Sequence, residues 1–325
     1  MAYRLKLVPD DTRIDFFRWA TLTFGGSFVA SIAAVILAIV MGLNFGIDFK
    51  GGTTIRTDSV TPVDVGAYRA AVKPLNLGDV SITQVYDPTF RADQHVAMLR
   101  IQAQEGSEAV TPETIARIET ALQQVDPSIT FPSVESVGPK VSGELIRTAV
   151  LSVLAGVFAI VVYIWLRFEW QFAIGAVAAL VHDIALTIGI FALFQIKFDL
   201  TIIAALLTIL GYSINDTVVV FDRLRENLTK YKKTPLRDLC NLSANETLSR
   251  TVMTSGTTLI ALIALLVLGG DVIRGFVFAM TWGVIVGTYS SIYVAKNVVL
   301  YLGVKRDWGR KGDTPAGTQF AGDGK

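Results

Sequence analysis

The stretch "LTIIAALLTILGYSINDTVVVFDRLREN", residues 200–227, joins a long apolar run to a charged segment. Residues 200–222 are long enough to cross the roughly 30 Å hydrocarbon core of a bilayer at about 1.5 Å per helical residue. Asn215 and Asp216 nevertheless lie inside this run. Ionisable residues at such a depth are costly, and they usually face a bundle interior or a wet cavity. The stretch therefore predicts a membrane helix that carries a polar site on one face.

The composition of the whole chain is that of a membrane protein. Of its 325 residues 52% are hydrophobic and 18% are charged, and the mean hydropathy is +0.51. These values are too apolar for an ordinary soluble protein of this length. The net charge of +1 indicates neither a nucleic acid nor an acidic partner. The single cysteine, Cys240, excludes an intrachain disulfide, and we expect an ordinary small residue in a polar cytoplasmic loop.

Six apolar runs have the length of membrane-spanning helices. Polar and mixed residues 1–19 precede the first run, and no small-residue cleavage site follows it closely, so we do not expect a cleavable signal peptide. A polar segment, residues 44–146, separates the first two runs and is expected to form a domain of its own. The runs cover residues 20–43, 147–166, 171–194, 200–222, 250–269 and 274–301, which predicts a membrane all-α bundle, residues 147–303 holding the last five spans.

Lysine and arginine are distributed unevenly between the two sides of the predicted bundle. They gather in residues 1–19, in the loop 223–249 and in the tail 304–325, whereas the short loops of the other side hold only Lys197 and Arg274. Cytoplasmic loops carry the excess of positive charge. We therefore expect both termini in the cytoplasm and the polar domain outside, in the periplasm of a Gram-negative cell. The composition of the tail predicts disorder.

The polar domain alternates between strand-like and helix-like patterns. Its first helix is expected to begin at Thr61, because Pro62 and Asp64 follow it as in a capping box. The order β-α-β-β-α-β is the ferredoxin-like pattern of an α+β domain, a fold that says little about function. The strands are expected at 53–58, 79–86, 95–103 and 129–137, and the helices at 61–75 and 111–125.

The sequence holds no motif of a hydrolase, a kinase or a nucleotide-binding protein. Neither a phosphate-binding loop nor a zinc-binding His-Glu-x-x-His motif is present. The two histidines, His95 and His182, belong to different predicted compartments. We therefore expect no catalytic residues, no metal site and no cofactor, and a protein that is not an enzyme.

Asp216 and Arg250 are the leading candidates for a functional pair. A carboxylate at this depth is influenced both by desolvation and by a nearby cation, and Arg250 begins the next apolar run at a similar depth. The pair is therefore a candidate proton pathway. Two structural interpretations stay open: Asp216 forms an interhelical hydrogen bond, or Arg250 extends its side chain to the lipid headgroups.

Three further polar residues lie inside predicted spans. His182 and Asp183 occupy the middle of the run 171–194, and Asn215 precedes Asp216. These residues either form a secondary proton relay or serve helix packing. Adjacent residues on a helix point in different directions, so His182 and Asp183 need not share one site.

Five motifs together carry a resemblance to a known family. The chain resembles the SecD/SecF family of protein-export membrane proteins, part of the RND transporter superfamily, over residues 20–303. The motifs are "FGIDFKGGT" (45–53), "VGPKVSGEL" (137–145), "VHD" (181–183), "GYSINDTVVVFDRLREN" (211–227) and "NETLSRTVMTSGTTL" (245–259).

This resemblance implies a role in protein export across the bacterial inner membrane. It implies an RND-type half unit of six helices that needs SecD as its obligate partner. The complex would use the proton-motive force to promote late translocation and release of a polypeptide, after the SecYEG channel and SecA have begun export, with YajC as a further partner. The aspartate and arginine of the family's fourth and fifth spans match Asp216 and Arg250.

Two other classes of function remain open at this point. One is half of an RND-type proton-coupled exporter of a lipid or a small hydrophobic solute, for which one ferredoxin-like domain is a small substrate site. The other is a scaffold without proton coupling, in which Asp216→Asn and Arg250→Ala would be silent.

Overall fold

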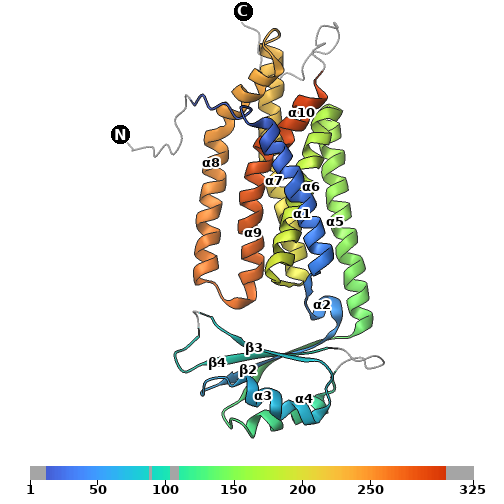
Figure 1. Ribbon diagram of the computed structural model, residues 1–325, viewed down its shortest axis with the longest axis vertical. Coiled ribbons are helices and arrows are strands. Elements are labelled where there is room, and N and C mark those ends of the chain that lie inside the picture. The colour runs from blue at the N-terminus through green and yellow to red at the C-terminus, as the bar shows by residue number, and fades with distance from the viewer. Residues whose placement is uncertain (1–11, 88–89, 103–109, 305–325) are drawn as a thin grey trace, which may run out of the picture.

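The computed structural model describes residues 12–87, 90–102 and 110–304. The molecule is elongated, with long helices at one end and a small sheet domain at the other (Figure 1). Residues 305–325, which hold nearly all of the tail predicted to be disordered, and residues 1–11 lie outside the described residues. Six helical segments of the described chain are long and apolar enough to cross a membrane: Ala20–Met41 (α1), Pro139–Arg167 (α5), Trp170–Phe194 (α6), Leu200–Lys230 (α7), Leu236–Leu268 (α8) and Asp271–Leu302.

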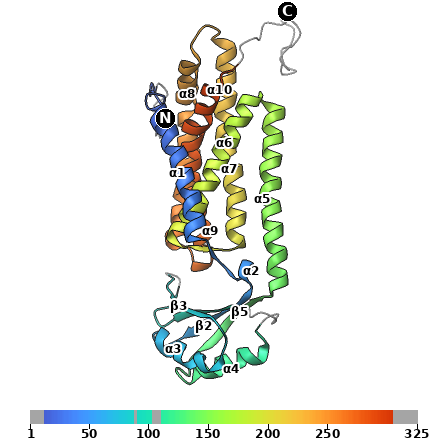
Figure 2. The ribbon, with the colours of Figure 1, turned by 45° about the vertical axis from the view of Figure 1, so that its right-hand side comes forward.

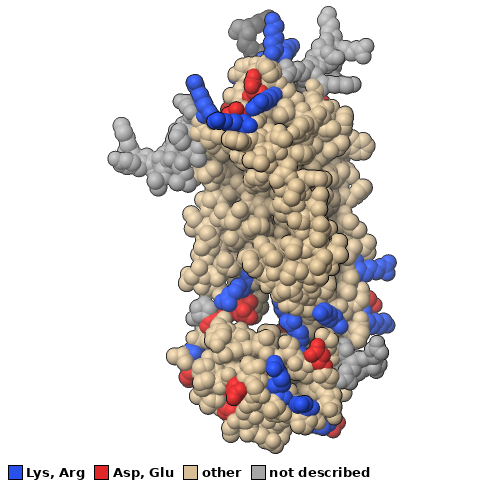
Figure 3. Space-filling view, viewed as in Figure 1, with Lys and Arg blue, Asp and Glu red and all other residues tan. Residues whose placement is uncertain are grey.

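The last segment is composite. It begins as α9, Asp271–Ser290, passes through a π-helix at Ser291–Ala295 and ends as α10, Lys296–Leu302. On the face drawn in Figure 3, a broad band over the helices shows no Lys, Arg, Asp or Glu, and charged side chains gather at the two ends of the molecule. This distribution matches the predicted all-α membrane bundle and confirms that fold class.

Three helices extend well beyond the predicted spans, and the expectation of a loop at 223–249 is wrong. Helix α5 begins at Pro139, so the predicted boundary of the polar domain at residue 146 lies inside this helix. Helix α7 continues to Lys230 and α8 begins at Leu236, directly after Pro235. At 1.5 Å per residue, the 31 residues of α7 measure about 46 Å, which exceeds the hydrocarbon core. Only residues 231–235 form the turn. The polar ends of α7 and α8 are stable outside the bilayer because they pack against each other and against the chain before α1.

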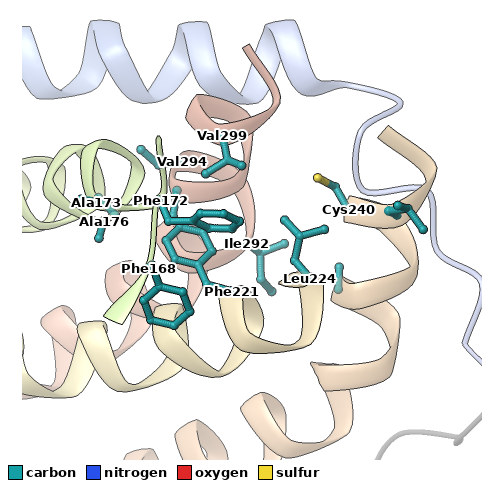
Figure 4. Close-up of a cluster of buried hydrophobic side chains, with 14 of the residues drawn as sticks. Phe168, Phe172, Ala173, Ala176, Phe221, Leu224, Cys240, Ile292, Val294 and Val299 are labelled. Atoms are coloured by element: carbon teal, nitrogen blue, oxygen red, sulfur yellow. The ribbon is translucent and has the colours of Figure 1, made fainter. Parts of the chain in front are cut away.

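Cys240 is not a loop residue as expected. It lies in the first turns of α8, its side chain is 0% exposed, and it belongs to a buried apolar cluster with Leu224 and Phe221 of α7 (Figure 4). The ring of Phe221 packs edge-on against Phe172 of α6, with 5.0 Å between centroids. The cluster therefore joins α6, α7, α8 and α10 at the end of the bundle that lies away from the sheet domain.

The sheet domain follows the predicted β-α-β-β-α-β order. Its antiparallel sheet has the strand order β3-β4-β2-β5, which is the ferredoxin-like arrangement, and α3 and α4 cover the face turned away from the bundle (Figure 2). The buried side chains of Ile55, Leu99, Ile118 and Leu122 fill the space between sheet and helices. The elements are β2 (Gly52–Ser59), α3 (Val65–Val72), a 3₁₀ turn (Lys73–Leu75), β3 (Val80–Val85), β4 (His95–Gln102), α4 (Pro112–Gln123) and β5 (Thr130–Val137).

The first helix of the domain starts later than predicted. Asp64 is the N-cap of α3 and accepts a hydrogen bond from the backbone N–H of Ala67 at 3.0 Å. Thr61, the expected cap, instead donates its hydroxyl to the carboxylate of Asp126. Asp126 also accepts from the backbone N–H and the hydroxyl of Ser128, at 2.8 and 2.7 Å. The hydroxyl of Thr61 thus connects the segment after β2 to the segment before β5.

Short elements that the sequence did not predict connect the two parts. Helix α2, Ile47–Lys50, packs on α5, and Gly51 and Gly52 follow it with φ of +71° and +125°, conformations that favour glycine. Residues Asn44–Phe45 (β1) pair in parallel with Lys197–Phe198 (β6) just before α7. The "FGIDFKGGT" motif therefore forms the joint between bundle and sheet domain.

Candidate functional site

Helices α7 and α9 approach each other closely in the centre of the bundle. A Cβ at Gly283 would lie less than 3.0 Å from three carbons of Ile209, and one at Gly287 would lie 3.1 Å from Cβ of Ser213. The Gly-x-x-x-Gly spacing thus removes the side chains that would separate the two helices. Polar side chains of α7 and α9 consequently meet the middle of α6.

Asp183 of α6 is the centre of this meeting point. Its side chain is 0% exposed, and one carboxylate oxygen, Oδ2, accepts hydrogen bonds from the hydroxyls of Ser213 of α7 and Ser290 of α9, at 2.6 and 2.8 Å. The other oxygen, Oδ1, lies 2.9 Å from Nδ1 of His182. Three helices are therefore tied to one buried carboxylate.

His182 continues the polar contacts toward α1. Its ring stacks on Tyr289 with 6.1 Å between centroids, and the hydroxyl of Tyr289 lies 3.0 Å from that of Ser27 and donates to the backbone carbonyl of Thr23. His182 and Asp183 do share one site, because the imidazole of His182 folds back to its neighbour. The contacts of the "VHD" motif agree with the helix-packing interpretation, because they connect four helices. The secondary proton relay stays a prediction.

Asp216 is also buried, one turn after Ser213 on α7, but it forms no hydrogen bond with the Asp183 network in the described chain. It is 4% exposed, and among the described residues its Oδ2 atom has no hydrogen-bond partner. One turn earlier, the hydroxyl of Tyr212 donates to Thr258 of α8 at 3.3 Å, so this face of α7 is turned toward α8. The hydroxyl of Thr251 of α8 is also buried without a partner in the described chain. Asp216 therefore lies in a polar seam between α7 and α8 rather than in the Asp183 network.

Arg250 lies on α8 with an exposed side chain. In the described chain it forms no ion pair with Asp216 within 4.0 Å, yet its guanidinium is close enough to interact electrostatically with that carboxylate. The predicted counter-charge is thus near Asp216 but separated from it. The buried carboxylate of Asp216 therefore has no cation in direct contact that would balance its negative charge.

Asn215 does not join either polar site. Its side chain is exposed on the outside of the bundle, on the same stripe of α7 as Thr208 and Gly211.

Ser290 belongs to the site although the sequence did not single it out. Its hydroxyl is one of many in the membrane helices, and only the rotation of α9 brings it to Asp183. Within the described residues no group of three or more His, Cys, Asp or Glu side chains could hold a metal ion.

The fold and the site together define a multi-span membrane protein with two buried aspartates among its central helices. Residues 117–305 match the family described as protein export membrane protein SecD/SecF, C-terminal, and residues 36–63 match the SecD/SecF GG motif. The chain belongs to the SecD/SecF family. It is 70% identical to the protein translocase subunit SecF of Cereibacter sphaeroides, with 99% of each chain covered. It is 39% identical to that of Vibrio alginolyticus, covering 93% of this chain and 94% of the relative.

Solved structures share this fold. The crystal structure of SecDF from Thermus thermophilus, a translocon-associated membrane protein, is similar with a TM-score of 0.80 and 36% identity over 91% of this chain. SecDF in its super-membrane-facing form gives a TM-score of 0.67 over 90% of this chain. The chain spans 39% of the length of each of these SecDF chains.

Proposed function

We propose that this chain is an accessory subunit of the Sec protein-export machinery of the bacterial inner membrane, and that it works as one half of a complex with SecD. The family membership and the match to only 39% of the SecDF chains support this pairing. The surface of the bundle supports it as well. Thr208, Gly211 and Asn215 of α7 and Arg250 of α8 are exposed where lipid would surround an isolated chain, and small and polar residues of this kind are typical of helix–helix interfaces.

We further propose that Asp216 is the group that takes up and releases a proton. One observation carries this proposal: of the two buried aspartates, Asp183 has hydrogen-bond partners at both oxygens, whereas Oδ2 of Asp216 has none in the described chain. Hydrogen bonds stabilise an ionised carboxylate, and burial without donors penalises it. Asp183 therefore holds the helices together, and Asp216 changes its charge.

Arg250 makes a change of charge at Asp216 mechanically effective. The ionised carboxylate attracts the guanidinium across the seam between α7 and α8, and protonation removes this attraction. The two helices then separate or slide, which changes the arrangement of the bundle. The membrane potential can drive this movement, because one charge that crosses the membrane gains about 2.3 kcal/mol per 100 mV.

The charge distribution supports an orientation for this cycle. The basic ends of the helices lie in the cytoplasm, with both termini, and the sheet domain lies in the periplasm. Protons enter from the periplasm, reach Asp216 and leave to the cytoplasm. The proton-motive force thereby promotes late movement and release of a polypeptide that SecA and the SecYEG channel have begun to export, with YajC as an additional partner.

The test is proton-driven export by membrane vesicles that contain the complex. We expect Asp216→Asn to abolish the stimulation that depends on the proton-motive force while the complex stays assembled. Asp222→Asn is the matched control, because Asp222 lies on the same helix but is exposed and pairs with Arg167 at 3.0 Å. If Asp216→Asn supports full proton-dependent export, the proposed proton site is wrong and a scaffold without proton coupling accounts for the protein better.

A further inference from the structure

The sheet domain and the joint that precedes it contact two of the bundle helices through carboxylates. Asp48 of α2 accepts a hydrogen bond from the backbone N–H of Leu200, the first residue of α7, at 3.1 Å. Asp87, in the segment after β3, accepts one from the backbone N–H of Asp271, the first residue of α9. Free N–H groups and the helix dipole make a helix N-terminus favourable for a carboxylate.

The contact at α9 is built for close approach. Gly270 is the N-cap of α9, and a Cβ at this position would lie 3.0 Å from Oδ2 of Asp87. Arg274, one turn into α9, donates to the backbone carbonyl of Tyr86 at 3.4 Å. The segment that carries Asp87 is therefore fixed to α9 at two points.

The contact at α7 has a second support of another kind. Gly46 donates its N–H to the carbonyl of Phe198 at 2.8 Å, within the short pairing of β1 with β6. Asp48 thus acts together with a backbone connection, whereas the side chains of Asp87 and Arg274 make the contact at α9. Removal of Asp87 should accordingly have the larger effect.

Helices α7 and α9, whose N-termini make these contacts, also meet at the buried aspartates. Three described membrane helices begin on the side of the sheet domain: α5, α7 and α9 (Figure 1). Helix α5 continues directly from β5 through Gly138. Helices α7 and α9 have no such covalent continuity, yet α7 carries Asp216 and both donate to Asp183.

We propose that Asp48 and Asp87 are coupling residues, which fix the sheet domain to the N-termini of α7 and α9 so that a displacement of either helix moves the domain. This inference rests on the proposed function, because protonation of Asp216 is the event that displaces the helices. Without these carboxylates a movement in the bundle would reach the domain mainly through the linkers at 42–46 and at Gly138, the β1–β6 pairing and the single bond from Arg274 to Tyr86.

The test measures two distances by pulsed electron paramagnetic resonance in the full chain, assembled with its SecD partner in lipid nanodiscs. Spin labels at Arg117→Cys on α4 and Phe194→Cys on α6 report the position of the sheet domain. Labels at Thr229→Cys on α7 and Tyr301→Cys on α10 report the bundle. Cys240 is buried and stays unlabelled. Asp216→Asn imitates the protonated state.

We expect Asp216→Asn to shift both distances in the otherwise unchanged chain. In the Asp48→Ala/Asp87→Ala variant we expect the bundle distance to shift as before and the sheet-domain shift to be lost. Asp87→Asn, which keeps an acceptor oxygen, should retain the sheet-domain shift.

Two matched controls separate coupling from helix stability. Asp199→Ala removes another carboxylate cap from α7, one that accepts from the N–H of Thr201 at 3.1 Å. Asp271→Ala removes a carboxylate from the first turn of α9. Neither side chain has a hydrogen bond to the sheet domain in the described contacts. Asp271 pairs with Arg274 at 3.6 Å, but Arg274 can still donate to Tyr86 without it, so both variants should keep both shifts.

Each contrary result has a distinct meaning. If the sheet-domain distance still shifts in the Asp48→Ala/Asp87→Ala variant, or never shifts while the bundle distance does, the coupling role is overturned and the proposed function stands. If Asp216→Asn shifts neither distance, the proposed function fails and the coupling inference falls with it.

Discussion

Two aspartates lie buried in the bundle, and their surroundings give them different tasks. Asp183 satisfies two hydroxyl donors and lies against one imidazole, in contact with three helices. Asp216 lies in the seam beside α8 with one oxygen unpartnered in the described chain. A buried polar group without a partner is costly. Asp216, for which we propose a change of charge, is the residue that carries this unfavourable free energy.

The stability of the bundle should depend strongly on Asp183. Asp183→Ala leaves the hydroxyls of Ser213 and Ser290 and the ring of His182 without their shared acceptor, and we expect a loss of about 2–4 kcal/mol of unfolding free energy. Ser290→Ala should cost about 1 kcal/mol, because one hydrogen bond is lost and no buried group remains unpaired. Denaturation in detergent followed by circular dichroism measures both. Equal stability of Asp183→Ala and the unchanged chain would show that the network does not hold the helices.

The sequence indicated the charged residues of the site but not their partners. Asp216, His182 and Asp183 stand out because ionisable groups are rare in apolar runs. Ser290 could not be found this way, since hydroxyl side chains are common in membrane helices and their partner depends on helix rotation. The separation of Arg250 from Asp216 could not be predicted either, because sequence spacing fixes depth and not the direction of a side chain.

At the level of secondary-structure elements, the close packing of α7 on α9 positions the site. Gly283→Ala would place a methyl group against Ile209, and we expect it to cost about 1–3 kcal/mol by overpacking. The additional change Ile209→Ala should restore part of this loss. Gly211→Ala is the control, because a Cβ at Gly211 meets nothing within 4 Å, and it should be neutral or slightly stabilising. Thermal unfolding of the three variants and the unchanged chain decides whether the close approach is essential.

The sheet domain should lose stability in acid because of Asp126. Burial alone raises the pKa of Asp126, but the hydrogen bonds from Thr61 and Ser128 outweigh burial and lower that pKa below its ordinary value of 3.8. The carboxylate therefore contributes stability that is present above about pH 4 and is lost as the pH falls through the lowered pKa.

Asp126→Asn tests this contribution. We expect the variant to be about 1–2 kcal/mol less stable at neutral pH and to lose less on acidification below pH 4. Hydrogen exchange of the amides of β2 and β5 in the full chain follows the sheet domain separately from the bundle. An unchanged acid dependence in Asp126→Asn would assign the acid sensitivity to other groups.

At the level of elements, hydropathy predicted where the spans lie but not how long the helices are. It detects the bilayer, whereas α7 and α8 continue into water, where packing around Leu224 and Cys240 stabilises them. The α+β order of the sheet domain was predictable because strand alternation and helix periodicity are local. The joint formed by α2 and the β1–β6 pairing was not, because it depends on contacts between residues 153 positions apart, as Asn44 and Lys197 are.

The whole molecule carries its excess of Lys and Arg at the end away from the sheet domain, which predicts its orientation in the membrane. Thr120 on α4 is exposed at the sheet end, and Lys233 is exposed in the turn between α7 and α8 at the other end. In intact spheroplasts a membrane-impermeant maleimide should label Thr120→Cys and not Lys233→Cys, and inverted vesicles should give the reverse. The chain with its native Cys240 alone should stay unlabelled, because that thiol is buried. Labelling of Lys233→Cys from outside would contradict the proposed orientation.

The proton site connects all three scales, since one carboxylate is proposed to move helices and the helices to move a domain. Infrared spectroscopy of the lipid-embedded complex during a pH titration tests this site most directly. We predict a buried carboxyl band that appears on acidification, persists in Asp222→Asn and is absent from Asp216→Asn. A titrating buried carboxyl band that remains unchanged in Asp216→Asn would contradict the assignment of the proton to Asp216.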